Sequence, residues 1–177
     1  MIEKFDVLNE KGEFTEKTAD RDECHENGLW HRAVVAFIIN SKNQVLLQKR
    51  SATKKLWPNC WDIIGGHVLV GEFGFQAAIR EVQEEIGIDI SANDLLLIGS
   101  VTSSVIKGDI IDNHFNDYFV ARKDIEINQL KIQEDEVQDV KWFDKGEVII
   151  RINNNYDGIT DKVGCWDYLK KYLIAFC

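Results

Sequence analysis

The sequence predicts an α+β fold in which helices cover both faces of a β-sheet. Strand-like apolar runs recur along the chain, one helical pattern occupies residues 73–86, and a second occupies residues 160–176. Strands that are interrupted by one helix and closed by another favour this layered arrangement. Because 45% of the 177 residues are hydrophobic, the chain can bury the core of a single domain, which we expect to span residues 1–177.

The first strands are predicted from apolar residues that alternate or form continuous runs. Residues 4–8 alternate, whereas residues 18–31 are polar, so residues 1–31 are expected to be an N-terminal strand and loop extension. Residues 33–39 form an apolar run, and residues 45–50 are expected to pair back on them as a hairpin.

The central helix is predicted at residues 73–86, after a short strand that ends in glycines. Its apolar side chains fall at helical spacing on one face; they are Phe75, Ile79, Val82 and Ile86. Gly87 suits the C-cap of this helix. Three further strands are expected between the two helices, at residues 95–106, 109–122 and 137–143. The pattern at residues 160–176 predicts an amphipathic C-terminal helix.

One segment combines glycines with clustered acids. It runs GHVLVGEFGFQAAIREVQEEIGI, from Gly66 to Ile88, with five residues before Glu72 and seven between Glu72 and the run REVQEEIGI. A helix turns by about 100° per residue, so the three glutamates of that run fall within an arc of about 100°. The apolar residues of the same helix lie on roughly the opposite side.

These three glutamates, Glu81, Glu84 and Glu85, occupy an electrostatically unfavourable position. Glu81 and Glu85 are four residues apart and repel each other, and the last helical turn, which holds Glu84 and Glu85, disfavours negative charge. Arg80 relieves Glu84 only in part. A cation would complete the site, and hard oxygen ligands suit Mg²⁺ or Mn²⁺. The alternative is that the glutamates form an ordinary solvated helix face.

The segment resembles the Nudix box, because every fixed position of that motif is present. The resemblance implies the Nudix fold, an α/β/α sandwich with a mixed sheet. It also implies an enzyme that cleaves the diphosphate linkage of a small molecule, such as a nucleoside diphosphate derivative, by attack of water on phosphorus with the help of metal ions.

The resemblance also assigns roles within the box. Glu81 and Glu85 would be the principal metal ligands, Glu84 would be a further ligand or the base, and the carbonyl of Gly66 would also coordinate. The expected catalytic residues are therefore Glu81, Glu84, Glu85 and Arg80. Before the helix, Glu72 would pair with Arg80 to structure a tight loop that contains Gly71. Many family members take a further acid from outside the box, and the candidates here are Asp112, His114, Asp117, Glu134 and Glu136.

A second resemblance concerns the segments HENGLWHRA and VLLQKRSATKKLWPNCWD. Both are similar to the isopentenyl diphosphate isomerases and their hydrolase relatives within the Nudix family. In those isomerases, histidines before the first core strand and just after the box glycine hold a metal. The resemblance implies a second metal site from His25, His31, His67 and His114; the alternative is that His25 and His31 are ordinary loop residues.

Three cations between the second core strand and the box are candidates for binding substrate. Arg50, Lys54 and Lys55 could contact the diphosphate away from the metal, although such a charge run is often only solvated surface. The isomerase resemblance breaks at Gly65, because the isomerases need a cysteine immediately before the Gly-His pair. The leading hypothesis is hydrolysis; the alternatives are an isopentenyl diphosphate isomerase-like enzyme and a non-catalytic nucleotide-binding module.

The net charge and the cysteine content indicate which classes of partner and which compartment to expect. A net charge of −9 argues against nucleic acid polymers, which bind basic surfaces, and is compatible with a small diphosphate substrate whose cation offsets the acids. No run of 18 apolar residues and no signal segment is present, so we expect no membrane association. Four cysteines without a paired spacing are expected to be reduced thiols in a cytoplasmic protein. The resemblance allows for a homodimer, which is common in the family.

Overall fold

The computed structural model describes residues 2–177. Its strands are β1 (Lys4–Leu8), β2 (Phe14–Asp20), β3 (His31–Ile39), β4 (Gln44–Arg50), β5 (Trp61–Asp62), β6 (Ile64–His67), β7 (Leu95–Lys107), β8 (Ile110–Arg122) and β9 (Val137–Asp144). Its helices are α1 (Arg21–Asn27), α2 (Gly74–Ile86), α3 (Lys145–Asn153) and α4 (Val163–Phe176), with short 3-10 turns at Ala92–Asp94 and Ile127–Gln129.

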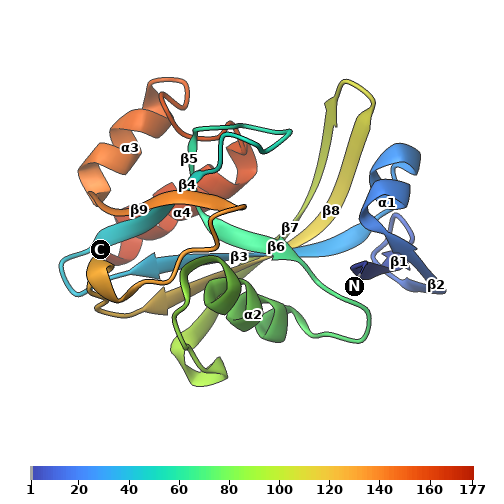
Figure 1. Ribbon diagram of the computed structural model, residues 1–177, viewed down its shortest axis with the longest axis horizontal. Coiled ribbons are helices and arrows are strands. Elements are labelled where there is room, and N and C mark those ends of the chain that lie inside the picture. Colours follow the sequence, from blue (N-terminus) through green and yellow to red (C-terminus); the bar gives the residue numbers. More distant parts are fainter. Residues whose placement is uncertain (1) are drawn as a thin grey trace.

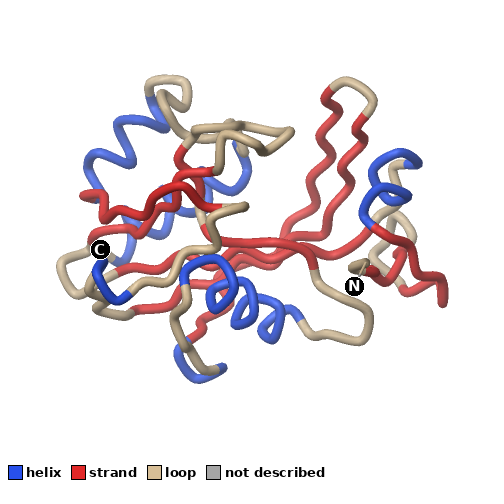
Figure 2. The backbone as a smooth tube through the Cα atoms, viewed as in Figure 1, coloured by secondary structure: helices blue, strands red, loops and turns tan. Residues whose placement is uncertain are grey.

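A mixed sheet separates two helical layers (Figures 1 and 2). Strand β3 is buried on both faces, and its alternating side chains enter two different cores. Phe37 packs with Trp166 and Leu169 of α4, together with residues of α3. Ile38, one residue further, packs with Val82 and with other residues of α2. The predicted α+β class and the sandwich of helices on both faces of a mixed sheet are therefore confirmed.

Strand β3 lies at the centre of the large sheet. The strand order is β5-β4-β3-β8-β7, with β6 pairing with β3 and β9 pairing with β4. The pairing of β3 with β8 is parallel and continuous, from His31 beside His114 to Ile39 beside Arg122. On the other side, the first half of β3 pairs antiparallel with β6.

The predicted hairpin of β3 and β4 forms only at its base. The two strands share the single register pair Ile39 and Val45, after which β4 pairs with β9 over almost its whole length. The reason is that β6 occupies the edge of β3 that β4 would otherwise use. This separation of β4 from β6 opens the sheet above α2, which is where the acidic residues of the box lie.

The apolar face predicted for the central helix is partly wrong. Ile86 and Val82 are fully buried, but Phe75 is 40% exposed and stacks on Phe73, with 5.9 Å between the ring centroids. The small residues Ala77 and Ala78 make the close contact with the sheet instead, where they pack with Val34 of β3 and Phe119 of β8.

The N-terminal extension contains more regular structure than predicted. Residues 18–31, expected to be loop, include the end of β2 and the whole of α1. Helix α1 begins where the carboxylate of Asp20 accepts a hydrogen bond from the backbone N–H of Glu23, and it ends at Gly28. Its sequence is polar because most of the helix is exposed, so no apolar period was available to predict it. Asn113 of β8 donates a hydrogen bond of 2.7 Å to the Gly28 carbonyl, which ties α1 to the β7–β8 hairpin.

Helix α3 was also not predicted. It follows β9 directly and buries Val148 and Ile152 against the core that α4 covers. Within the described residues, no helix is long and apolar enough to cross a membrane.

Candidate active site

A cavity of about 1240 Å³ runs along the opening of the sheet and unites two clusters of ionisable side chains. One cluster holds the acids of α2, and the other holds histidines from α1, β3, β6 and β8. The three acids, together with His25, His67, Asp112 and His114, line the same cavity as the cationic residues at the end of β4 and just after it, whereas His31 lies behind this wall.

The acidic cluster is organised by Arg80. Its guanidinium donates to both carboxylate oxygens of Glu72, at 3.1 and 3.0 Å, and to the carbonyl of His67 at 2.7 Å. Glu72 in turn accepts the backbone N–H of Leu69 at 3.0 Å, and Gly71, with φ of +75°, donates its N–H to Asp6. The structure thus brings Glu72 and Arg80 together, and the bidentate geometry fixes the loop between β6 and α2.

Glu81 lies directly beneath the strand that carries the box glycine. A Cβ atom on Gly66 would fall 2.3 Å from a carboxylate oxygen of Glu81, so no larger residue fits without displacing that carboxylate. The remaining Nη1 of Arg80 donates to Glu81 at 2.7 Å and to Glu84 at 3.1 Å. The glycine therefore allows the backbone of β6 and the Glu81 carboxylate to lie side by side.

The other two acids of the cluster differ sharply in exposure. The Glu84 side chain is 49% exposed, whereas Glu85 is buried and accepts a hydrogen bond of 2.9 Å from Gln48 of β4. Gln48 was not singled out from the sequence, because it lies in an otherwise apolar strand. Its position above the C-terminal turn of α2 results from the separation of β4 from β6.

Burial raises the pKa values of Glu81 and Glu85 in the metal-free protein. Desolvation raises the pKa of Glu81 to about 7 despite the neighbouring Arg80, and it raises the pKa of Glu85 well above its ordinary value, with Glu81 adding repulsion. One guanidinium cannot neutralise three carboxylates. The cluster therefore contains more negative charge than the protein itself compensates, and its oxygen donors suit a divalent cation.

The second cluster contains four histidines and an aspartate. His31 and His114 are register partners across the parallel β3–β8 pair, and His67 of β6 pairs with the residue two positions after His31. Helix α1 brings His25 against the same group. The ligand atoms of His25, His31, His67, Asp112 and His114 all lie within 4.8 Å of one another. Asp112 was only one of several candidate acids in the sequence, but it lies two residues before His114 and so shares its face of β8.

The chemistry of this cluster fits a metal ion. Nε2 of His67 is buried and has no hydrogen-bond partner among the described residues, whereas Oδ1 of Asp112 lies 3.1 Å from Nε2 of His25 and 2.7 Å from Nε2 of His114. Desolvation and the nearby His114 lower the pKa of His31 to about 4, and burial lowers the pKa of His67 well below its usual value. Although burial raises the pKa of Asp112, His114 and His25 hold it well below its ordinary range. Neutral imidazoles at His31 and His67 beside an ionised Asp112 are the protonation states that metal binding requires.

The three predicted substrate-binding cations all line the cavity. Arg50 donates to Asp62 at 3.3 Å and to the carbonyl of Leu56 at 3.1 Å. Lys54 forms an ion pair with Glu136, another of the candidate acids, so much of its charge is already compensated. Lys55 lies on the same loop.

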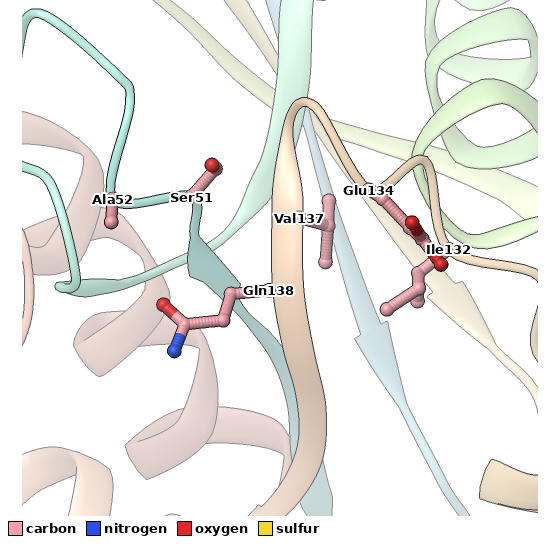
Figure 3. A pocket seen from close by; sticks show the side chains of 6 residues that line it. All are labelled: Ser51, Ala52, Ile132, Glu134, Val137 and Gln138. Atoms are coloured by element: carbon pink, nitrogen blue, oxygen red, sulfur yellow. The ribbon is translucent and has the colours of Figure 1, made fainter.

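The remaining candidate acids lie elsewhere. Asp117 pairs with Arg32 and accepts a hydrogen bond from Ser100. Its carboxylate lies next to Gly74, at the start of α2. Glu134 belongs to a separate, smaller pocket of about 330 Å³ between the end of β4 and the segment before β9 (Figure 3). That pocket is formed by Ser51, Ala52, Ile132, Glu134, Val137 and Gln138 and contains none of the box acids or histidines.

The family follows from comparison with known proteins. A family model described as NUDIX domain matches residues 29–163. The chain belongs to the Nudix family. A Nudix hydrolase of Listeria monocytogenes, itself uncharacterized, is 38% identical over 148 residues, which cover 83% of each protein. Together, the domain and such relatives make this chain a Nudix-type hydrolase.

Two further similarities concern the subgroup and the fold. An isopentenyl-diphosphate Delta-isomerase of Escherichia coli is 30% identical over 122 residues, which cover 68% of this chain and 65% of that enzyme. The crystal structure of a Deinococcus radiodurans protein superimposes with a TM-score of 0.72 and 23% identity, covering 93% of this chain and 98% of that one. The Nudix resemblance predicted from the box is confirmed, including its isomerase-like subgroup.

This Nudix protein nevertheless has no room at position 65 for the cysteine that the isomerases need. A Cβ atom on Gly65 would lie 2.3 Å from the backbone carbonyl oxygen of Val34 on the neighbouring strand β3. A cysteine there would require the strands to move apart. Cys60, the nearest thiol in the sequence, is not among the residues that line the cavity.

Proposed function

We propose that the chain hydrolyses the diphosphate linkage of a small molecule, such as a nucleoside diphosphate derivative, with Mg²⁺ or Mn²⁺ held by Glu81 and Glu85. The observation that carries this proposal is the excess of carboxylates at the end of α2, where Glu85 is buried, the Glu81 side chain is only 13% exposed and one arginine opposes them. The backbone of Gly66 passes next to Glu81, so its carbonyl would be a further ligand.

The residues of the chain would divide the work as follows. When bound, the ion would neutralise charge on the phosphate oxygens and make the attacking water more acidic. Glu84 is half exposed at the cavity wall and would accept the proton of that water or add a ligand. Arg80 orients Glu81 and Glu84 and anchors the loop through Glu72, while Arg50 and Lys55 would bind phosphate oxygens away from the acids.

The histidine cluster supports a second metal site in the same cavity. Five converging donors, among them a buried Nε2 of His67 that lacks a hydrogen bond, favour an ion bound by His25, His31, His67, Asp112 and His114. Mixed imidazole and carboxylate ligands suit Zn²⁺ or Mn²⁺ better than Mg²⁺. The four cysteines are all free, which accords with a reducing compartment such as the cytoplasm.

The experiment is a turnover assay with nucleoside diphosphates, sugar nucleotides, dinucleoside polyphosphates and isopentenyl diphosphate in the presence of Mg²⁺ or Mn²⁺. We expect phosphate or nucleotide release, and a loss of at least about a hundredfold in kcat for Glu85→Gln and Glu84→Gln. Glu147→Gln is a matched control, since Glu147 pairs with an arginine four residues away on α3, outside the cavity. Near-normal turnover by both box variants would refute the assignment. Interconversion of isopentenyl and dimethylallyl diphosphates would support the isomerase, and tight binding without turnover would support a binding module.

A further inference from the structure

A carboxylate outside the box, Asp62, is fully buried and holds two cations that face the cavity. Its Oδ1 accepts hydrogen bonds from the backbone N–H of Ile63 and from the hydroxyl of Thr160, both at 2.9 Å. Its Oδ2 accepts from Nζ of Lys162 at 2.7 Å and from Nη1 of Arg50 at 3.3 Å. The exposed fraction of the Asp62 side chain is zero, so its charge reaches solvent only through these partners.

This arrangement joins two segments that are about a hundred residues apart. The backbone of Trp61 pairs with residues 158–160, donating to the Gly158 carbonyl and accepting from Thr160, both at 3.0 Å. Thr160 is further fixed by the indole of Trp166, which donates to its carbonyl at 2.6 Å. These hydrogen bonds fix the backbone two residues before Lys162, so the position of Lys162 beside β5 does not depend on its own side chain alone.

The charged groups of Arg50 and Lys162 keep hydrogen-bond donors that can bind a ligand in the cavity. Arg50 and Lys162 both line the cavity, whereas Asp62 lies behind them. Lys162 uses one of its three donors for Asp62, and its ammonium lies 5.6 Å from the ring centroid of Trp57. Within the described part of the chain, Nη2 of Arg50 has no protein hydrogen-bond partner, while Nε and Nη1 are both used.

The charges of this group favour an anion. Asp62, Arg50 and Lys162 together carry a net charge of +1, whereas the charge of Lys54 is opposed by Glu136. The Asp161 carboxylate also lines this part of the cavity, where it accepts the indole N–H of Trp57. Two fixed donors of different shape, a planar guanidinium and an ammonium, are a common way to bind two oxygens of one phosphate.

We propose that Lys162 binds substrate together with Arg50, and that Asp62 is the positioning residue that holds both cations toward the phosphate farther from the box acids. This proposal deepens the proposed function and rests on it, since it assumes a substrate with at least two phosphate groups. It makes the segment before α4 part of the substrate site and predicts that compounds with a single phosphate bind more weakly than diphosphates.

The test measures binding separately from turnover. The probe is methylenediphosphonate, a diphosphate analogue that cannot be hydrolysed at its bridge, added to the full chain with Mg²⁺ in a calorimeter. The variants are Lys162→Met, Lys162→Arg and Arg50→Met, with Lys170→Met as the control. Lys170 is a lysine of α4 that makes one hydrogen bond, to Asn153, and does not line the cavity.

We expect Lys162→Met to weaken binding of the probe by about tenfold or more, because it removes a charged hydrogen-bond donor to a phosphate oxygen. Lys162→Arg should restore most of the affinity, and Lys170→Met should bind like the unmodified chain. With a hydrolysed substrate, Lys162→Met should raise KM with little change in kcat. Asp62→Asn should raise KM in the same way, because an amide cannot hold both cations.

Two results would overturn the proposal: unchanged affinity of Lys162→Met for the probe, or a loss that Lys162→Arg does not restore while thermal stability falls in parallel. The latter would mean that Lys162 only neutralises Asp62. Failure of the proposed function would be distinguishable, since it would appear as absence of turnover by the unmodified chain while the probe still binds and responds to the Lys162 variants.

Discussion

Replacing Glu81 by glutamine should stabilise the metal-free protein at alkaline pH, although it removes a proposed metal ligand. The pKa of Glu81 rises from 4.5 to about 7 because its carboxylate is desolvated. At about 1.4 kcal/mol per pH unit, this corresponds to about 3 kcal/mol of unfavourable free energy when the group is ionised. Loss of the ion pair with Arg80 reduces the gain, so we expect the variant to be more stable by about 1–3 kcal/mol.

The sign of the pH dependence follows from the raised pKa. Below pH 7 the folded protein takes up a proton that the unfolded chain takes up only near pH 4.5, so the unmodified protein gains stability as the pH falls through this window. The advantage of Glu81→Gln should therefore be complete above about pH 8 and should disappear toward pH 4.5.

The assay is chemical unfolding in the presence of a chelator at several pH values, with Glu84→Gln as a control. Glu84 is half exposed, so its replacement should change stability little. Addition of Mn²⁺ should reverse the order, because ion binding stabilises the unmodified protein and not the Glu81 variant. If Glu81→Gln were less stable than the unmodified chain at pH 8 in chelator, or if its effect did not vary with pH, the account of a strained acidic cluster would be wrong.

Three further predictions concern the surroundings of the two clusters. Gly66→Ala should lower kcat by about a hundredfold or more, measured in the turnover assay, because its Cβ would displace the Glu81 carboxylate; normal turnover would contradict the close approach. Arg80→Lys should lower the midpoint of thermal unfolding by several degrees, since an ammonium cannot form the bidentate pair with Glu72, and an unchanged midpoint would count against this role. For His31, the lowered pKa of about 4 means that its contribution to metal-free stability is complete above pH 6.5 and is lost as the pH falls toward 4. The free energy of unfolding of the unmodified protein should thus fall relative to that of His31→Gln by about 3 kcal/mol over this window in urea titrations, and a constant difference would refute the shift.

The acidic cluster was the part of the site most open to prediction from the sequence, because its residues belong to one helix and the loop before it. Spacing along a helix fixes direction, so the positions of Glu81, Glu84 and Glu85 follow from the repeat of 3.6 residues. The pairing of Arg80 with Glu72 depends on a loop of only a few residues. The exposure of Phe75 could not be predicted in this way, because it depends on which helix residues pack against the side chains of β3 and β8.

The rest of the cavity depends on contacts between distant segments. Asp112 joins the histidines only because β3 and β8 pair in parallel in one particular register, and nothing in either strand alone specifies that register. Lys162 reaches Asp62 through pairing of Trp61 with a segment that has no strand pattern. The polar helix α1, which carries His25, is defined by its capping residues and not by apolar periodicity.

The boundary of the family match has a consequence for how this cavity is built. The matched region begins at residue 29, so it leaves out β1, β2 and α1. Yet this N-terminal piece supplies His25 and also Phe5, whose ring stacks on His67 with centroids 4.6 Å apart. Replacement or loss of these first 28 residues would therefore alter the histidine cluster while every residue of the box stayed in place. Two proteins with the same box need not catalyse the same reaction.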